Sequence, residues 1–224
     1  MIKIDKVEVF GFEAAIRGCR NPMNSWDKSD SHYGCYMGHN QSPYDCSICT
    51  DDCMAYKHNY IIGPNDLTLM KKLVKAGNDH SKFMRMINVT MDITAPLYWW
   101  KEADTYVIGK VQNSCSTMHK IHAKEFTLDD FSCEHLTEKA LEDFEHLIGV
   151  LNYYRRAFVE QKEKVWWWNI IQLLPSSYNQ KRTIQLNYAV LRNMYHSRKN
   201  HKLDCWRDFC KWVETLPYSE LIVC

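Results

Sequence analysis

The sequence has no excess of charge of either sign: its 224 residues hold 28 Lys and Arg against 27 Asp and Glu. A bulk nucleic-acid binder needs positive charge in excess, so that class is excluded. No run of about 18 apolar residues occurs, which excludes a membrane-spanning helix. Glycine (8 residues) and proline (6) are scarce, so a linker-rich or fibrous chain is excluded as well. What is present, 46% hydrophobic and 25% charged residues, is the composition of a folded globular protein.

The amino-terminal residues 1–9 alternate polar and apolar side chains. This pattern predicts a strand and lacks the apolar core of a signal peptide. We therefore expect a cytoplasmic protein. In that compartment the 10 Cys are expected to be free thiols, metal ligands or redox groups rather than a disulfide framework.

Hydrophobic periodicity predicts an α+β fold in a single domain over residues 1–224. Residues 83–95 alternate in a period of two, which is typical of a strand with one buried face. Apolar residues at helical spacing, with capping and stop signals, predict a set of helices. These cover residues 65–76, 97–100, 137–162, 166–174, 183–198 and 203–213. In the first of them Asn65-Asp66 is expected to be the amino-terminal cap. Residues 18–64 hold five of the Cys and little periodicity, so an irregular Cys-rich segment is expected there.

The Cys-rich segment contains a short motif with metal-ligand spacing. Cys46 and Cys49 are separated by two residues, and Cys53 follows closely. Such a set suits a structural zinc ion, with Cys35 or His39 as the fourth ligand. The alternatives are a redox pair or thiols that only pack.

The segment 113–119 places four small polar side chains in a row, ending in Met118-His119. Such a run, with its backbone N–H groups, suits an anion or nucleotide pocket. If the segment is helical, Cys115, His119 and His122 share one face and suit a metal. The alternative is a capped helix start with ordinary surface histidines.

The predicted helix 183–198 carries Asn187 and Arg198 eleven residues apart. Eleven residues bring both side chains to one side of a helix, about 16 Å apart along its axis. The alternative is that Arg198 and the basic residues after it only complement the helix dipole.

Residues 79–117 and 171–206 together resemble the flavin-dependent thymidylate synthases of the ThyX type, in the divergent branch common in bacteriophage genomes. His80 matches the His of the family's Gly-His-x-x-Pro-Phe-Glu-His motif, and Pro96 follows the strand at the family's spacing. Lys101-Glu102 stands where the family has Arg-Gln. The second half matches without a gap at the following positions: Leu174-Pro175, Tyr178, Asn187, Asn193 and Arg198.

The resemblance implies the ThyX fold, a small antiparallel sheet packed with long helices, in a homotetramer with sites at subunit interfaces. Such interfaces would account for two aromatic stretches that are expected to be exposed, Trp99-Trp100 and Trp166-Trp167-Trp168. It implies transfer of a one-carbon unit from methylene tetrahydrofolate to C5 of a dUMP-like deoxypyrimidine monophosphate, with FAD as cofactor. Arg198 would be catalytic by polarising the pyrimidine. The implied cofactor-binding residues are His80, Lys82, Asn187 and Asn193. The implied substrate-binding residues are Lys101, Ser114, Cys115, Ser116, Thr117 and Arg198.

The chain also departs from the family pattern. Thr105-Tyr106-Val107 replaces the Arg-His-Arg signature, and Cys115 replaces its serine; Ile171 and Thr117 stand where arginines would be. Each lost charge-assisted contact is worth about 1.5–3 kcal/mol, so other cations must replace them if phosphate is bound. The candidates are Lys82, Lys101, Lys110, Lys120, Arg192 and the Cys-rich segment 18–64. The departures leave two alternatives open: a flavin-free or non-catalytic nucleotide-binding relative, and a metal-dependent enzyme on the same scaffold.

Overall fold

The computed structural model describes residues 2–34 and 60–224. Contacts between residues divide the chain into two compact units. Unit 1 comprises Met1–Glu8, Thr90–Gln185 and Ser197–Trp212. Unit 2 comprises Val9–Val89, Leu186–His196 and Val213–Cys224.

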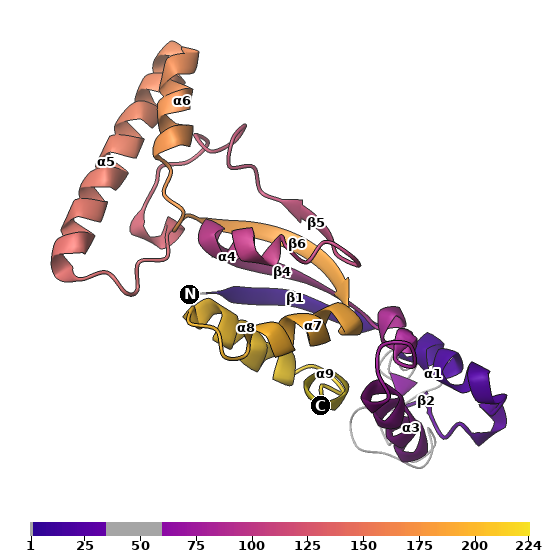
Figure 1. Ribbon diagram of the computed structural model, residues 1–224. Helices are drawn as coiled ribbons and strands as arrows, with labels where there is room; N and C mark the ends of the chain where they lie inside the picture. Colours follow the sequence, from indigo (N-terminus) through magenta and orange to yellow (C-terminus); the bar gives the residue numbers. More distant parts are fainter. Residues whose placement is uncertain (1, 35–59) are drawn as a thin grey trace, which may run out of the picture. The chain divides into compact units, whose positions relative to one another are not determined.

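A sheet in the strand order β1-β4-β6-β5 is the framework of the fold (Figure 1). Strands β5 and β6 pair antiparallel, with Asn113 opposite Thr183. The strands are β1 (Lys3–Phe10), β4 (Asn88–Pro96), β5 (Val111–Ser114) and β6 (Asn179–Asn187).

Strand β4 shows the alternation that its sequence predicts. Val89, Met91 and Ile93 are fully buried, whereas Asp92, on the other face, is only half-buried. The predicted strand began too early, because residues Lys82–Met86 form the 3-10 helix η4. The sheet therefore has an apolar face for helices and a polar face that carries charged side chains.

In unit 1, aromatic rings pack together between two helices. Helix α4 (Leu97–Ala103) carries Trp99 and Trp100, and helix α8 (Asp204–Glu214) carries Trp206. The rings of Trp99 and Trp206 have centroids 4.7 Å apart. Trp99 and Trp100 are 0% and 1% exposed, so the expectation that they form an exposed aromatic stretch was wrong.

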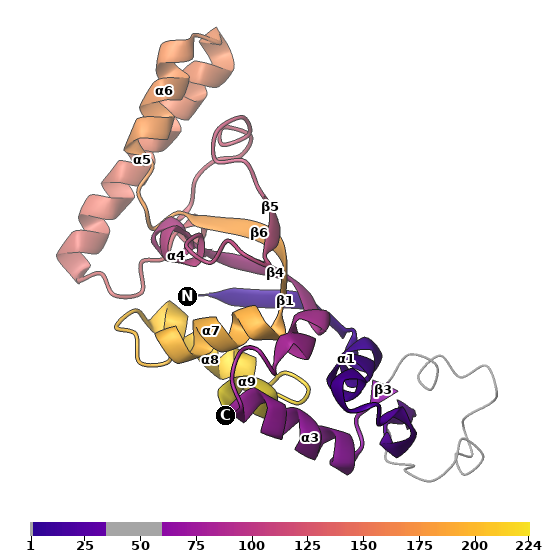
Figure 2. The same cartoon turned by 45° about the vertical axis from the view of Figure 1, so that its right-hand side comes forward.

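Helices α5 (Glu138–Gln161) and α6 (Lys164–Leu173) lie side by side as a helical hairpin, the α5–α6 hairpin (Figures 1 and 2). Both were predicted, because each has apolar residues at helical spacing. The side chain of Thr137 caps α5 by accepting a hydrogen bond from the backbone N–H of Ala140. Their buried apolar residues join a core with the preceding loop: Ile121, Phe126, Phe131, Ile148, Leu151 and Ile170.

Unit 2 consists mainly of short helices. Within it the ring of Phe12 packs edge-on against the rings of Tyr188 and Tyr218. The two-stranded sheet of β2 and β3 is antiparallel. The elements are α1 (Phe12–Arg20), β2 (His32–Tyr33), β3 (Tyr60–Ile61), α3 (Pro64–Lys75) and α9 (Glu220–Val223), with most of α7 (Tyr188–Arg198).

Helix α3 is capped differently from the sequence prediction, which gave that role to Asn65 and Asp66. The carboxylate of Asp30 accepts hydrogen bonds from the backbone N–H groups of Asn65 and Asp66, at 2.8 and 3.0 Å. Asp66 is fully buried instead, where it pairs with Arg20. A cap supplied from 35 residues upstream leaves no local sequence signal.

The predicted helix 183–198 was wrong in its first five residues. These belong to strand β6, where Ile184 and Leu186 are buried and alternate with more exposed side chains. The helix begins only at Tyr188. Asn187 is therefore the last residue of a strand and does not share a helix face with Arg198.

The predicted α+β fold is confirmed, with long helices beside a small antiparallel sheet. Within residues 2–34 and 60–224, none of the helices has the length and apolar character needed to cross a bilayer.

Candidate functional site

The most organised polar cluster of unit 1 surrounds Arg198, the last residue of α7. We call it the Arg198 cluster. Its members are Glu102, Tyr106, Arg198, His201 and Trp206.

Two hydrogen bonds and a ring fix the guanidinium of Arg198. Its Nε donates to the hydroxyl of Tyr106 at 3.0 Å, and its Nη1 donates to Glu102 Oε2 at 2.8 Å. The guanidinium carbon also lies 4.9 Å from the centre of the Trp206 ring, a cation–π distance. The third nitrogen, Nη2, has no hydrogen-bond partner within the described ranges. Arg198 keeps 20% of its side chain exposed, so this nitrogen is the donor left for a ligand.

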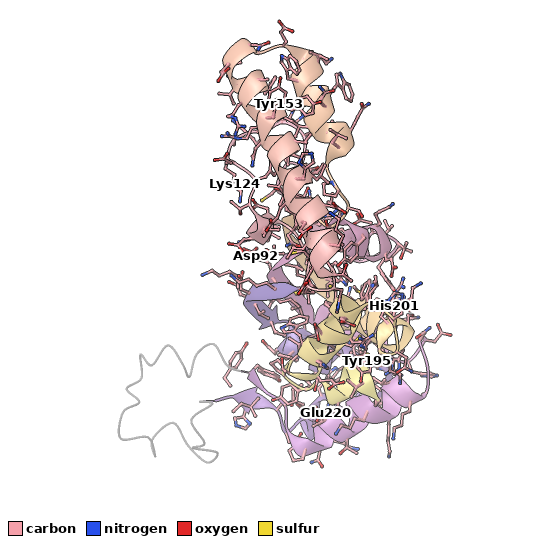
Figure 3. All side chains as sticks on the ribbon, turned by 90° about the vertical axis from the view of Figure 1, so that its left-hand side faces the viewer. Asp92, Lys124, Tyr153, Tyr195, His201 and Glu220 are labelled. Carbon is pink, nitrogen blue, oxygen red and sulfur yellow. The ribbon has the colours of Figure 1, made fainter. Side chains whose placement is uncertain are left out.

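One oxygen of Glu102, Oε2, accepts two hydrogen bonds and has a histidine ring nitrogen nearby. Besides Arg198, the buried indole Nε1 of Trp206 donates to Oε2 at 2.8 Å. His201, labelled in Figure 3 after the end of α7, accepts from the backbone N–H of Leu203 through Nδ1. In the neutral ring this leaves the proton on Nε2, which lies 3.4 Å from the same oxygen of Glu102.

The loop after α4 is held by a second set of contacts around Arg182 on β6. Arg182 donates to both carboxylate oxygens of Asp104, at 2.8 and 3.1 Å, and lies 4.2 Å from the centre of the Trp100 ring. Lys110 donates to the same carboxylate at 3.2 Å. Burial alone would raise the pKa of Asp104, but hydrogen bonds from Gln112 and Arg182 outweigh it and lower the pKa. The segment from Asp104 to Lys110, which carries Tyr106, is therefore anchored at both of its ends.

A depression of about 460 Å³, open to solvent, lies where β5 meets β6. We call it the β5–β6 pocket. Its cation, Lys181, is paired with Asp92 at 2.8 Å, and Thr183 donates to the other oxygen of Asp92 at 2.6 Å. The hydrogen bond from Lys181 holds the pKa of Asp92 below its usual range. The residues that line the pocket are Asn113, Ser114, Cys115, Lys181 and Thr183.

The predicted substrate-binding residues lie only in part in these two places. Ser114 and Cys115 line the β5–β6 pocket. The hydroxyl of Ser116 accepts from the backbone N–H groups of Met118 and His119, and so closes a local turn. Thr117 is half-buried. Lys101 is exposed on α4, directly before Glu102. All of these residues, like Arg198, belong to unit 1.

The predicted cofactor-binding residues all lie in unit 2. The side-chain oxygen of Asn187 caps α7 by accepting from the backbone N–H of Val190 at 3.1 Å, which leaves its amide N–H groups as donors. Asn193, His80 and Lys82 are exposed.

Two of the expected replacement cations have other roles. Lys110 keeps only 5% of its side chain exposed and donates to the carbonyl of Ala103 as well as to Asp104. Arg192 donates to the carbonyl oxygens of Ile222 and Cys224. Lys82, Lys101 and Lys120 remain as exposed cations.

The two metal hypotheses have different outcomes. Cys46, Cys49 and Cys53, with Cys35 and His39, lie outside the described residues. The alternative set of Cys115, His119 and His122 required a helix, but the segment after β5 consists of turns. In the parts of the chain that the structure describes, no three His, Cys, Asp or Glu side chains are placed to hold one metal ion.

Sequence reasoning missed most of the Arg198 cluster. Glu102 was noted only as a departure from a family Gln, and Tyr106 only as a missing His. Trp206 stands at the end of the segment that resembles the family, and no local pattern signals its contact with Arg198, because the two residues lie on different helices.

Comparison with solved structures gives full-length fold matches. The flavin-dependent thymidylate synthase ThyX from Helicobacter pylori, complexed with FAD and dUMP, matches with a TM-score of 0.64 and 16% identity, covering 98% of each chain. A second structure of that protein with FAD and dUMP matches with a TM-score of 0.65 and 16% identity, covering 100% of this chain and 98% of the other.

The UMP/dUMP methylase PolB from Streptomyces cacaoi, bound with 5-Br dUMP, matches with a TM-score of 0.60 and 11% identity, covering 99% of this chain and 94% of the other. Comparison with family models gave no match, and comparison with curated proteins gave none either. The chain therefore has the ThyX-like fold over nearly its whole length.

Proposed function

We propose that this chain is a flavin-dependent transferase that adds a one-carbon unit from methylene tetrahydrofolate to C5 of a deoxypyrimidine monophosphate. The observation that carries the proposal is the Arg198 cluster, on a scaffold shared with dUMP-binding proteins. It holds a guanidinium whose Nη2 has no partner among the described residues. Fold likeness alone does not fix an activity, so the argument depends on the residues of the site.

Arg198 would act on the pyrimidine ring. A guanidinium that stabilises a deprotonated ring nitrogen, or the negative charge that this places on a ring carbonyl, raises the electron density available at C5, where the new bond forms. Tyr106 and Glu102 hold the guanidinium in one orientation, so little reorganisation is needed when the nucleotide binds. The β5–β6 pocket, with Ser114 and Cys115, would seat the nucleotide.

The cofactor would be FAD, held by His80, Lys82, Asn187 and Asn193. The side-chain N–H groups of the two asparagines, which have no partner among the described residues, could donate to the carbonyl groups of a flavin ring. The positive charge of Lys82 suits the pyrophosphate of FAD. When bound, reduced flavin supplies the hydride or carries the methylene group, so no protein nucleophile is required.

A specific observation favours a second candidate, a flavin-free nucleotide-binding relative. Tyr106 lies in the middle of the segment where the family signature has Arg-His-Arg, and its hydroxyl is bound to Arg198. The neighbours Thr105 and Val107 supply no charge. The visible spectrum of the purified protein, followed by titration with dUMP, separates the two candidates. Flavin absorption with nucleotide binding supports the first, and binding without flavin supports the second.

We expect the protein to be a homotetramer. The α5–α6 hairpin exposes large apolar side chains: Tyr153 (labelled in Figure 3) at 56%, Val165 at 51% and Trp168 at 42%. Patches of this kind often mark subunit interfaces. Light scattering should report about four times 26.6 kDa at micromolar concentration, and a monomeric mass with and without ligand would contradict the expectation.

We also expect one zinc ion bound by Cys46, Cys49 and Cys53. Elemental analysis of protein purified without chelator should find about one zinc per chain. Cys49→Ser should lose the metal, whereas the control Cys224→Ser should keep it. Zinc-free wild-type protein would reject this site and leave the transferase proposal standing.

The same proposal places the protein in the cytoplasm, of the host cell if it is phage-encoded, where folate and nucleotide substrates are met. Partition of the expressed protein in cell fractions tests this placement.

A further inference from the structure

The contacts around Arg182 bring two cations to one carboxylate. Arg182 and Lys110 both pair with Asp104, at 2.8 and 3.2 Å, and among the described residues neither is paired with another carboxylate. Their side chains are only 11% and 5% exposed. The pKa of Lys110 lies below its ordinary value, first because of burial and further because of the charge of Arg182, although Asp104 opposes both. Since buried charges are normally paired, one positive charge is left to be balanced by a second anion.

The guanidinium of Arg182 has one nitrogen left for a ligand. Its Nε donates to Gln180 Oε1 at 2.9 Å, and its Nη1 donates to Asp104 and to Gln112. Nη2 has no hydrogen-bond partner among the described residues. The guanidinium carbon lies over the Trp100 ring, 4.2 Å from its centre. The guanidinium is therefore held in place before a ligand binds, which lowers the entropic cost of binding.

Ser114 lies directly opposite Arg182 in the register of β5 and β6. Opposed side chains of an antiparallel pair point to the same face of the sheet, with Cβ atoms about 4.5–5.5 Å apart. Ser114 is exposed, and its hydroxyl has no hydrogen-bond partner in the part of the chain that the structure describes. A hydroxyl donor is thus placed beside the charged donor of Arg182. Ser114 also lines the β5–β6 pocket, so this pair of donors adjoins the place where the nucleotide is proposed to bind.

The chemistry of these donors matches a phosphate group. A phosphate monoester carries between one and two negative charges at neutral pH, enough to balance the excess charge of the cluster. Its terminal oxygens accept from a guanidinium and a hydroxyl at once, and such charge-assisted contacts are stronger than neutral ones. Thr117 and Ile171 stand where the family pattern has arginines, so the phosphate of a bound nucleotide needs a cation from elsewhere.

We propose that Arg182 and Ser114 bind the 5′-phosphate of the nucleotide, with Lys110 adding positive charge beside them. This inference rests on the proposed function and names the phosphate-binding residues of its site. Arg182 was not among the cations that the sequence suggested, because its partners come from β5 and from the loop after α4. Each of the two donors is expected to contribute about 10- to 100-fold to the affinity for the nucleotide.

Calorimetric titration of the purified full-length protein tests the inference with dUMP, dCMP, their nucleosides and inorganic phosphate. The wild-type protein should bind its nucleotide at least about tenfold more tightly than the matching nucleoside. Arg182→Gln and Ser114→Ala should each weaken nucleotide binding by about 10- to 100-fold and leave nucleoside binding unchanged. Inorganic phosphate should compete with the nucleotide but not with the nucleoside. The matched control Arg156→Gln, at an exposed arginine of α5, should keep the wild-type affinities.

A further variant distinguishes phosphate binding from a structural role of the cluster, because Arg182→Gln also removes contacts that hold the loop after α4. Asp104→Asn removes the negative charge and keeps the size of the side chain. It should bind the nucleotide at least about threefold more tightly, since less negative charge then faces the phosphate. A cluster that only held the loop would give weaker or unchanged binding in this variant.

The outcomes separate this inference from the proposed function. Wild-type nucleotide affinity in folded Arg182→Gln and Ser114→Ala, checked by circular dichroism, overturns the phosphate site and leaves the transferase proposal intact. Weaker or unchanged binding by Asp104→Asn does the same, as does equal affinity of the wild-type protein for nucleotide and nucleoside. If Arg182→Gln does not fold, Ser114→Ala decides, because Ser114 is exposed. Binding of neither nucleotide by folded wild-type protein overturns both proposals.

Discussion

Arg198→Ala is expected to lower turnover of the pyrimidine nucleotide by about 10²–10³-fold, the usual effect of removing one donor that stabilises developing charge. Arg198→Lys should fail nearly as badly. The guanidinium uses Nε for Tyr106, Nη1 for Glu102 and its planar face for Trp206. A lysine ammonium keeps the charge but cannot make the fork and the stacking contact together.

The test of Arg198 is single-turnover kinetics and nucleotide binding for both variants, with folding checked by circular dichroism. Arg156→Ala is the matched control, because Arg156 is 55% exposed and contacts only Glu125, at 3.4 Å, among described residues. Arg155, the neighbouring residue on α5, is less suitable as a control. Its Nε donates a hydrogen bond to the carbonyl of His122 at 3.0 Å, so its replacement would remove a structural contact. A folded Arg198→Ala variant with parental binding and turnover would show that Arg198 has no role in the reaction.

The second large effect is expected in unit 2, at the buried pair of Arg20 and Asp66. Their side chains are 6% and 0% exposed, and Arg20 Nε donates to Asp66 at 2.5 Å. Asp66→Ala leaves the Arg20 charge buried without its partner, which typically costs about 3–5 kcal/mol of unfolding free energy. Denaturant unfolding of Asp66→Ala should show this loss, whereas Asp79→Ala, at an exposed position, should change stability by less than about 0.5 kcal/mol.

The same pair predicts a pH dependence of stability. Burial alone would raise the pKa of Asp66, but hydrogen bonds from Ser29, Ser31 and Arg20 outweigh it and hold the pKa below its ordinary value. A carboxyl with a lowered pKa contributes stability that is present above its unfolded pKa of about 3.9 and lost as the pH falls through the folded value. Wild-type protein should therefore lose stability in acid more steeply than Asp66→Asn. Equal acid sensitivity of the two proteins would contradict the assignment.

The sequence was sufficient where one local pattern decides the structure. Strand β4 follows from its alternation, because every second side chain is buried and those between them are only half-buried. Helices α5 and α6 follow from their apolar residues at helical spacing. Residues 183–187 of β6 were predicted as helix. They are a short alternating run directly before a true helix, and in so few residues the period of a strand cannot be distinguished from that of a helix.

The candidate site was predictable only in part, because its contacts join residues far apart in sequence. Glu102 and Arg198 are 96 positions apart, and Trp206 lies 104 positions from Glu102. The resemblance supplied Arg198 but not the carboxylate that holds it. The buried pair of unit 2 was missed for the same reason, since Asp66 reads locally as a helix cap and its partner is 46 positions away.

The central claim, substitution at C5 of a deoxypyrimidine monophosphate, is tested most directly by release of tritium from C5. Purified protein is incubated with methylene tetrahydrofolate, a reductant, FAD and 5-tritiated dCMP or dUMP. Substitution at C5 must expel the hydrogen there, so the account predicts tritium in water with wild-type protein and a rate lower by about 10²–10³-fold with Arg198→Ala. No release from either nucleotide, by protein that binds it, would contradict the account.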